Sequence, residues 1–197
     1  MNNSFKGDSE NFDRNWSTRP EAGYLHWTSG EPQNQIQLAF LNHWKTFSQI
    51  LADREVTVGK CLEVGCGRGS LSGYFSQNGW DSTLFDLSKT VIDKAKSAFK
   101  ENRLNASFLV GDCQDMPFED NTFDCIFSIG LIEHFENVYK VLEEQYRCLR
   151  SGGIVFGYIV PEKIVTVQEE YNWFNSILSS EIESPGVQKA SIYRSTY

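Results

Sequence analysis

The chain has 197 residues, of which 40% are apolar and 22% are charged, a composition typical of one folded globular domain. Its net charge of −8 at pH 7 gives no electrostatic support for binding nucleic acid or an anionic membrane surface. We therefore expect neither nucleic acid nor a membrane among its partners.

The five cysteines, at positions 61, 66, 113, 125 and 148, form no C-x-x-C pair. An odd number at this spacing predicts neither a disulfide framework nor a zinc site, and it is typical of a reducing compartment. The sequence also has no stretch of the roughly 20 apolar residues that a membrane-spanning helix needs. We therefore expect a cytoplasmic protein without a bound metal.

Residues 1–32 show little periodicity, and aromatic side chains, prolines and glycines are scattered through them. One interpretation is a loose N-terminal arm that packs partly on the domain. The other is a lid, in which Tyr24, His26 and Trp27 would cover a bound ligand. We assign the remainder, residues 33–197, to a single domain.

Strands and helices are predicted to alternate from residue 33 onward. Apolar residues at helical spacing predict helices over 33–52, from Ser70 to about Asn78, from the N-cap Ser88 onward, over 133–149 and within 162–183. Apolar runs predict strands over 60–64, 80–85, 106–110, 123–129 and 154–160. This order predicts right-handed βαβ units and hence an α/β fold with a mostly parallel sheet.

A glycine-rich turn, GCGRG at 65–69, joins the first predicted strand to the next helix. A glycine at a strand end can adopt a positive φ without a Cβ clash, and a missing side chain lets a ligand approach the main chain. The third glycine, Gly69, would allow the helix to pack closely on the strand. Such turns also occur where no ligand binds, so the turn alone leaves both interpretations open.

Acidic residues stand at the ends of the next two predicted strands, at the edge of the sheet where ligands of open α/β folds bind. The Asp86 carboxylate could accept both hydroxyls of a ribose, and Leu87 could cover an adenine face. Asp112 could accept from an exocyclic amine, while the Cys113 backbone N–H meets a ring nitrogen. Either aspartate alone could be a turn former, but their register with the glycine turn favours a ligand site.

Four blocks of the sequence resemble class I S-adenosylmethionine-dependent methyltransferases of the small-molecule type. They are LEVGCGRGSLS at 62–72, LFDLS at 84–88, VGDCQDMPFEDNTFDCIFSIGLIEHF at 110–135 and LRSGGIVFGYIVP at 149–161. The blocks stand in the family's order and spacing. The resemblance implies a Rossmann-like three-layer sandwich, S-adenosyl-L-methionine as cofactor with S-adenosyl-L-homocysteine as product, and methyl transfer to an unidentified small molecule.

The resemblance also assigns residues to the cofactor site, in three groups. The group that would border the methionine part is Glu63, Gly65, Cys66 and Gly67. The group that would hold the ribose and adenine is Asp86, Leu87, Asp112 and Cys113. The group that would lie beside the transferred methyl is Ser128 to Gly130. Tyr24 or Trp27 could close over the cofactor.

Methyl transfer from a sulfonium is an in-line displacement, in which the protein aligns the reacting groups and keeps water out. No covalent nucleophile is needed, and a general base is needed only for a hydroxyl or a protonated amine. His134, just past the 123–129 strand, is the best-placed candidate for that base, although a histidine at a helix start more often has a structural role, hydrogen-bonded to the backbone. His26 and His43 have weaker claims.

Two other functions are consistent with parts of the pattern. A nicotinamide-dependent dehydrogenase prefers G-x-G-x-x-G, whereas here the third glycine comes one position early and Ser70 stands in its place. A catalytically silent regulatory module or subunit would keep the cofactor fold, and cofactor binding without turnover would identify it.

The family carries two further strands after the fifth, often as an antiparallel hairpin, whereas only residues 162–197 follow Pro161 here. We expect the chain to be C-terminally truncated and to lack this hairpin. The fifth strand would then be an apolar sheet edge through which oligomers could form.

Overall fold

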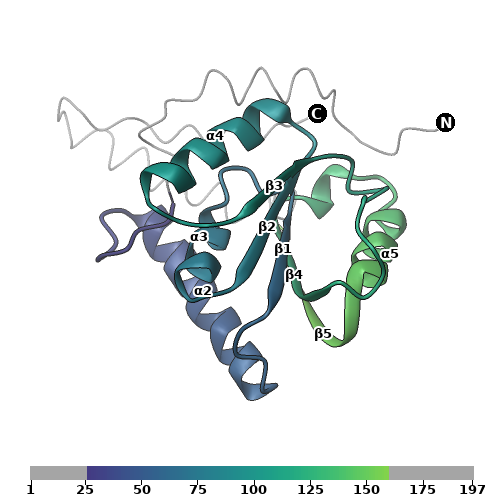
Figure 1. The fold of residues 1–197 in the computed structure, drawn as a ribbon, viewed down its shortest axis with the longest axis horizontal. Coiled ribbons are helices and arrows are strands. Elements are labelled where there is room, and N and C mark those ends of the chain that lie inside the picture. The colour runs from purple at the N-terminus through teal and green to yellow at the C-terminus, as the bar shows by residue number, and fades with distance from the viewer. Residues whose placement is uncertain (1–25, 160–197) are drawn as a thin grey trace, which may run out of the picture. The chain divides into compact units, whose positions relative to one another are not determined.

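A five-stranded sheet in the order β3-β2-β1-β4-β5 organises the computed structural model, which describes residues 26–159 (Figure 1). Every pairing of neighbouring strands is parallel, as the alternation of strands and helices predicts. The strands are β1 (Lys60–Val64), β2 (Asp81–Asp86), β3 (Ser107–Val110), β4 (Phe123–Ile129) and β5 (Leu149–Tyr158). The chain winds outward in both directions from β1, so the topological switch point lies between β1 and β4.

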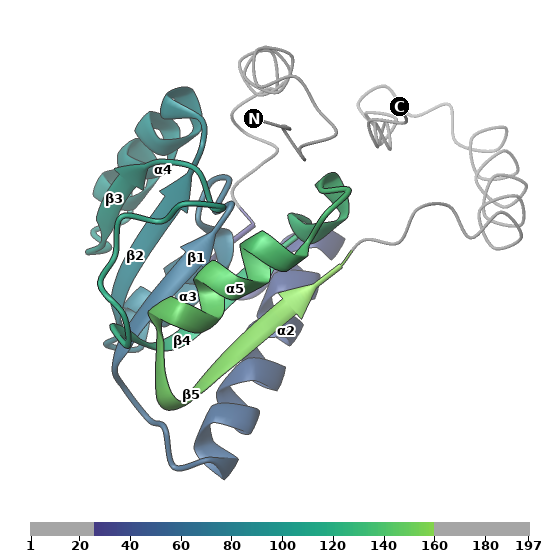
Figure 2. The same cartoon turned by 90° about the vertical axis from the view of Figure 1, so that its right-hand side faces the viewer.

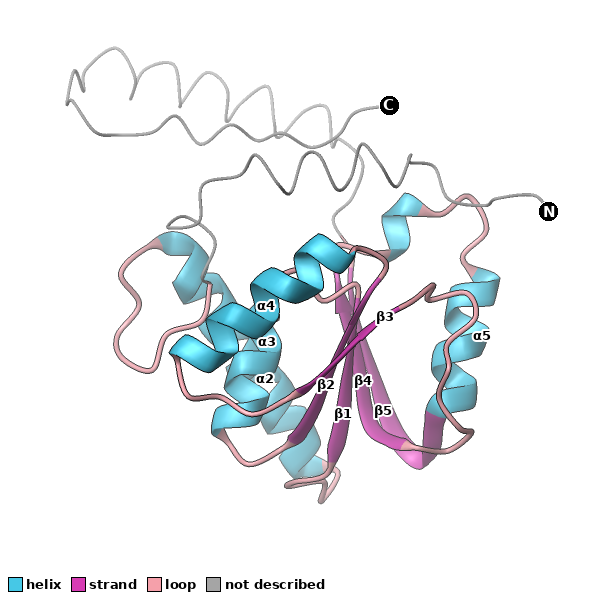
Figure 3. Ribbon diagram, turned by 45° about the horizontal axis from the view of Figure 1, so that its top comes forward, coloured by secondary structure: helices cyan, strands magenta, loops and turns pink. Residues whose placement is uncertain are grey.

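Helices cover both faces of the sheet, which confirms the three-layer α/β architecture. They are α2 (Gln35–Asp53), α3 (Ser70–Gln77), α4 (Lys89–Glu101) and α5 (Tyr139–Cys148). The first three lie on one face and α5 lies on the other (Figures 2 and 3). Side-chain caps begin two of them: Asn34 accepts from the Gln37 N–H, and Ser88 accepts from the Val91 N–H.

Strand β1 is buried between these two helical layers, and alternate residues point to opposite faces. Cys61 packs in one apolar cluster with Phe75 of α3. Leu62 packs in another with Val141 of α5. Burial on both faces explains why this strand reads as an apolar run without alternation.

The predicted helix over 133–149 is wrong in its first six residues. A short 3-10 turn occupies Ile132–His134, Phe135 is extended and buried, and α5 begins only at Tyr139. The Asn137 side chain accepts from the Tyr139 backbone N–H at 3.0 Å. Such a local side-chain bond stabilises a turn at the expense of an earlier helix start.

The fifth strand begins at Leu149, five positions before its predicted start at Ile154. Leu149 pairs with Phe123, and the register then shifts before Ile154 pairs with Cys125. Gly152 has a φ of +80°, and a Cβ at Gly153 would lie 2.9 Å from the Asp124 carbonyl oxygen. The glycines therefore allow an irregularity within the strand, where sequence reasoning placed a break.

Several expectations concern residues outside the described range, among them the covering role of Tyr24 and the helix within 162–183. Trp27 is described, and it lies in the core beside Gly73 and Tyr74, with its indole N–H donated to Gln77 at 3.3 Å. Trp27 is therefore buried against α3. No helix among residues 26–159 is long and apolar enough to cross a membrane.

Gly69→Ala should destabilise the fold far more than Gly79→Ala, although both glycines have positive φ values of +69° and +86°. A Cβ at Gly69 would overlap Leu84 and lie 2.9 Å from a Phe99 ring carbon, whereas nothing lies within 4 Å at Gly79. We expect losses of about 3 kcal/mol and about 1 kcal/mol in the free energy of unfolding, measured by urea denaturation. Equal losses at the two positions would contradict the close packing of α3 on β2.

Candidate functional site

The glycine turn after β1 adopts the conformation that its sequence predicts. Gly65, Gly67 and Gly69 have φ values of +65°, +53° and +69°. The backbone N–H groups of Gly65 and Cys66 both donate to the Phe85 carbonyl oxygen, at 2.8 and 3.1 Å. A Cβ at Gly65 would lie 2.8 Å from Leu131 Cδ1. The turn is therefore held against the end of β2 and approached closely from the end of β4.

Asp86 ties this turn to the start of α4. Its side chain is buried, with Oδ2 accepting from the Gly67 N–H at 3.1 Å and Oδ1 accepting from the Ser88 N–H at 3.0 Å. Each carboxylate oxygen can accept a second hydrogen bond. Asp86 is thus oriented in advance, as a bidentate acceptor for a diol requires.

Glu63, the penultimate residue of β1, is also buried, with a relative exposure of 3%. Its Oε2 accepts from the Ser72 N–H in α3 at 3.0 Å. Burial, reinforced by the nearby Asp86 carboxylate, raises the pKa of Glu63 to about 7, although the hydrogen bond from the Ser72 N–H opposes this shift. A cationic group placed beside Glu63 would relieve this destabilisation of its ionised form.

The residues predicted to meet a base lie beyond the ends of β2 and β3. Leu87 is 46% exposed although it directly follows the buried Asp86. The Gly111 N–H donates to the Asp86 carbonyl oxygen at 3.0 Å, which brings the exposed Asp112 to the same edge. Burial, with a smaller contribution from Asp112, raises the pKa of the Cys113 thiol to about 12, so this thiol stays protonated at pH 7.

The end of β4 completes this edge of the sheet. Ser128 is buried and pairs in register with Gly157 of β5. Gly130 has a φ of +68°, and its N–H donates to the Tyr158 carbonyl oxygen at 2.9 Å. His134 follows in the 3-10 turn, where its backbone N–H donates to the Leu131 carbonyl oxygen at 3.1 Å. The predicted site residues therefore come from four successive strand ends, as the sequence analysis requires.

A row of aromatic rings that the sequence does not predict borders the ends of β4 and β5 on the α2 side. His26 lies 4.8 Å from Phe40, Phe40 lies 5.8 Å from His43, and His43 lies 4.2 Å from Tyr158, all between ring centroids. Phe40 and His43 are three residues apart on α2, a spacing that places both on one helix face. This spacing in the sequence is the feature that could have indicated a role of His43 at this edge of the sheet.

Both histidines in this row are disfavoured as cations. Burial, with help from the Arg68 guanidinium, lowers the pKa of His26 to about 4. Burial also lowers the pKa of His43. These rings are therefore neutral at pH 7, which suits an apolar or aromatic neighbour. Within residues 26–159 no group of three or more acidic, histidine or cysteine side chains could hold a metal ion, and all five cysteines are free and buried.

Comparison with known proteins gives one family. Residues 62–157 match the family described as Methyltransferase domain. A malonyl-[acyl-carrier protein] O-methyltransferase of Pectobacterium atrosepticum is 31% identical over 94 residues, which are 48% of this chain and 36% of that protein. A sterol 4-C-methyltransferase of Caenorhabditis elegans is 30% identical over 95 residues, which are 47% of this chain and 28% of that protein. The chain thus matches about a third of the length of these relatives.

The fold has solved counterparts as well. A protein of Pyrococcus horikoshii OT3 superposes with a TM-score of 0.60 and 26% sequence identity. The superposition covers 74% of this chain and 64% of that protein. The similarity therefore extends over about three quarters of this chain.

Proposed function

We propose that this chain binds S-adenosyl-L-methionine at the carboxyl edge of its sheet, because residues 62–157 match the methyltransferase-domain family and four blocks of the sequence resemble methyltransferases that use this cofactor. We further propose that it promotes methyl transfer to a small-molecule acceptor. The observation that carries the proposal is Asp86, a buried carboxylate held in place by two backbone N–H groups at the strand end next to the glycine turn.

The residues present fit a nucleoside with a cationic amino-acid tail. Asp86 would accept the ribose hydroxyls, and the exposed Leu87 would contact the adenine face. Asp112 would accept a hydrogen bond from the exocyclic amine of adenine, and the Cys113 backbone N–H would donate to a ring nitrogen. Glu63, whose ionised form is destabilised by burial, would face the cationic end together with the turn at 65–67. Ser128 and Gly130 would lie beside the methyl group.

Bound S-adenosyl-L-methionine supplies a methyl group already activated by its positive sulfur. The contribution of this chain is then orientation and exclusion of water at the strand ends. Gly65, where Leu131 approaches the main chain, and the fixed Asp86 would orient the two ends of the cofactor. No side chain needs to form a covalent bond.

The acceptor would approach from the side of α2, where the rings of Phe40, His43 and Tyr158 border the end of β5. A neutral imidazole there could take a proton from a hydroxyl acceptor, and this gives His43 a claim beside that of His134. Relatives named as an O-methyltransferase and as a C-methyltransferase both match this chain, so the acceptor atom is left unassigned.

The proposal is tested by two measurements on the full chain. Calorimetric titration with S-adenosyl-L-homocysteine should show micromolar binding, and radiolabelled S-adenosyl-L-methionine should label a small molecule in a panel of phenols, amines and carboxylic acids. Binding without labelling of any acceptor would favour a silent regulatory module. A folded protein that binds neither ligand would contradict the proposal.

A further inference from the structure

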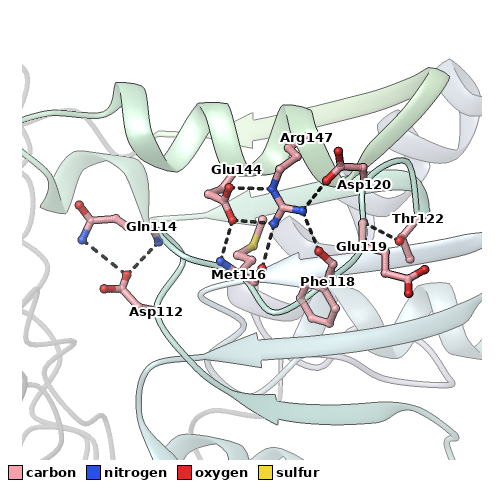
Figure 4. Close-up of polar contacts among 9 residues, drawn as sticks. All are labelled: Asp112, Gln114, Met116, Phe118, Glu119, Asp120, Thr122, Glu144 and Arg147. Atoms are coloured by element: carbon pink, nitrogen blue, oxygen red, sulfur yellow. Dashed lines mark hydrogen bonds and ion pairs between the residues drawn. The ribbon is translucent and has the colours of Figure 1, made fainter.

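The loop from Gly111 to Thr122, between β3 and β4, carries Asp112 and Cys113 and has no regular helix or strand. A loop of this kind would ordinarily sample several conformations, and each would move Asp112. Two residues of α5, Arg147 and Glu144, form hydrogen bonds to this loop (Figure 4). We refer to this pair as the α5 clamp.

The guanidinium of Arg147 donates hydrogen bonds both to Glu144 and to the loop. Its Nε and one terminal nitrogen donate to the two carboxylate oxygens of Glu144, at 2.8 and 2.7 Å. The same terminal nitrogen donates to the Met116 carbonyl oxygen at 2.9 Å. The other donates to the Phe118 carbonyl oxygen at 2.7 Å and to Asp120 at 2.8 Å. These five bonds match the five N–H donors of an arginine side chain.

Glu144 holds the loop directly as well. Its Oε2 accepts from the Met116 backbone N–H at 2.7 Å, so the clamp binds both polar groups of the Met116 main chain. The hydrogen bonds from Arg147 lower the pKa of the Glu144 carboxyl, which therefore stays ionised at neutral pH. The Met116 side chain is buried in the cluster beneath α5.

The residues directly before Met116 are hydrogen-bonded back to Asp112, at the base end of the site. The Asp115 N–H donates to the Asp112 carbonyl oxygen at 3.1 Å, and the Gln114 N–H donates to Asp112 Oδ1 at 2.9 Å. The Phe118 ring lies 5.4 Å from the Phe85 ring, directly before Asp86 in the chain. Both acidic residues of the nucleoside site are thus connected to the segment that the clamp holds.

We propose that the α5 clamp is a positioning device for base recognition, which sets the preference of the site for a 6-aminopurine over a 6-oxopurine. The inference rests on the proposed function, because it assumes that Asp112 accepts from the exocyclic amine. A 6-oxo group would present an acceptor to this carboxylate, so the preference depends on where Asp112 is held. Lysine cannot replace Arg147, since its ammonium has three donors and no planar fork.

The test is calorimetric titration of the full chain with S-adenosyl-L-homocysteine and with S-inosyl-L-homocysteine, in which the 6-amino group is replaced by oxygen. Wild type should prefer the adenosyl ligand by about tenfold or more, as expected for one hydrogen bond to a charged group. Arg147→Lys should lower this preference to about twofold by weakening only the adenosyl ligand. Glu144→Gln, which keeps the side-chain shape, should act in the same direction.

Lys89→Gln provides the matched control, because it removes an exposed ion pair with Asp93 on α4 and should leave both affinities unchanged. Thermal unfolding of each variant shows whether it is folded. If Arg147→Lys is not folded, the test is made with Glu144→Gln instead. An unchanged preference in a folded clamp variant, or equal weakening of both ligands, would overturn the positioning role. Failure of folded wild type to bind the adenosyl ligand would instead overturn the proposed function, and this inference with it.

Discussion

Asp86→Ala is expected to weaken binding of S-adenosyl-L-homocysteine by about 100-fold or more in calorimetric titration. Two hydrogen bonds to a charged carboxylate are lost, and each contributes about 1.5 to 3 kcal/mol. The substitution also frees the Gly67 and Ser88 N–H groups, which Asp86 holds at 3.1 and 3.0 Å. Both effects act on the ligand-binding edge of the sheet. The loss in binding free energy should therefore exceed the loss in the free energy of unfolding.

Asp93→Ala is the matched control for this experiment, because Asp93 is an exposed aspartate whose partner is Lys89 on the same helix. It should bind as wild type does. Asp86→Asn should be intermediate, since its amide retains one acceptor oxygen but turns an N–H₂ group toward a donor. If Asp86→Ala folds and binds with wild-type affinity, the ribose contact is wrong.

Ligand affinity should also depend on pH through Glu63, whose pKa is raised from 4.5 to about 7 by burial, with a contribution from Asp86. Below pH 7 the unliganded carboxyl is mostly protonated, and the ammonium group of S-adenosyl-L-homocysteine favours its ionised form. Binding at pH 6 should therefore release about one proton, and affinity should rise nearly tenfold per unit between pH 5 and pH 7. Titrations in buffers with different ionisation enthalpies measure the released proton.

The same pKa shift makes the stability of the unliganded protein fall with rising pH, whereas ligand affinity rises. The folded state holds the Glu63 proton more tightly than the unfolded state, so this contribution is complete below pH 4.5 and is lost as the pH rises to about 7. Glu63→Gln should remove both dependences and bind at pH 8 about as weakly as wild type does near pH 5. Wild-type affinity that stays constant from pH 5 to pH 8 would show that no cation lies beside Glu63.

The sequence alone determined those parts of the protein whose physical cause is local. Alternating apolar runs and helical spacing predict the parallel α/β sheet, and Gly65 at the end of the first strand predicts a turn with a positive φ. Ser88 was predicted as a helix cap because its hydroxyl reaches only the next turn of its own chain. The predicted helix start near 133 is wrong because Asn137 stabilises a competing turn.

Only the tertiary structure decided which contacts position the site residues and how their pKa values are shifted. Arg147 reaches Asp120, Phe118 and Met116 across 27, 29 and 31 residues of sequence, and no local pattern encodes such a contact. His43 meets Tyr158 only because α2 packs along β5. The raised pKa of Glu63 needs complete burial and the neighbouring Asp86 from the next strand. These properties arise from residues that become neighbours only when the sheet and its helices assemble.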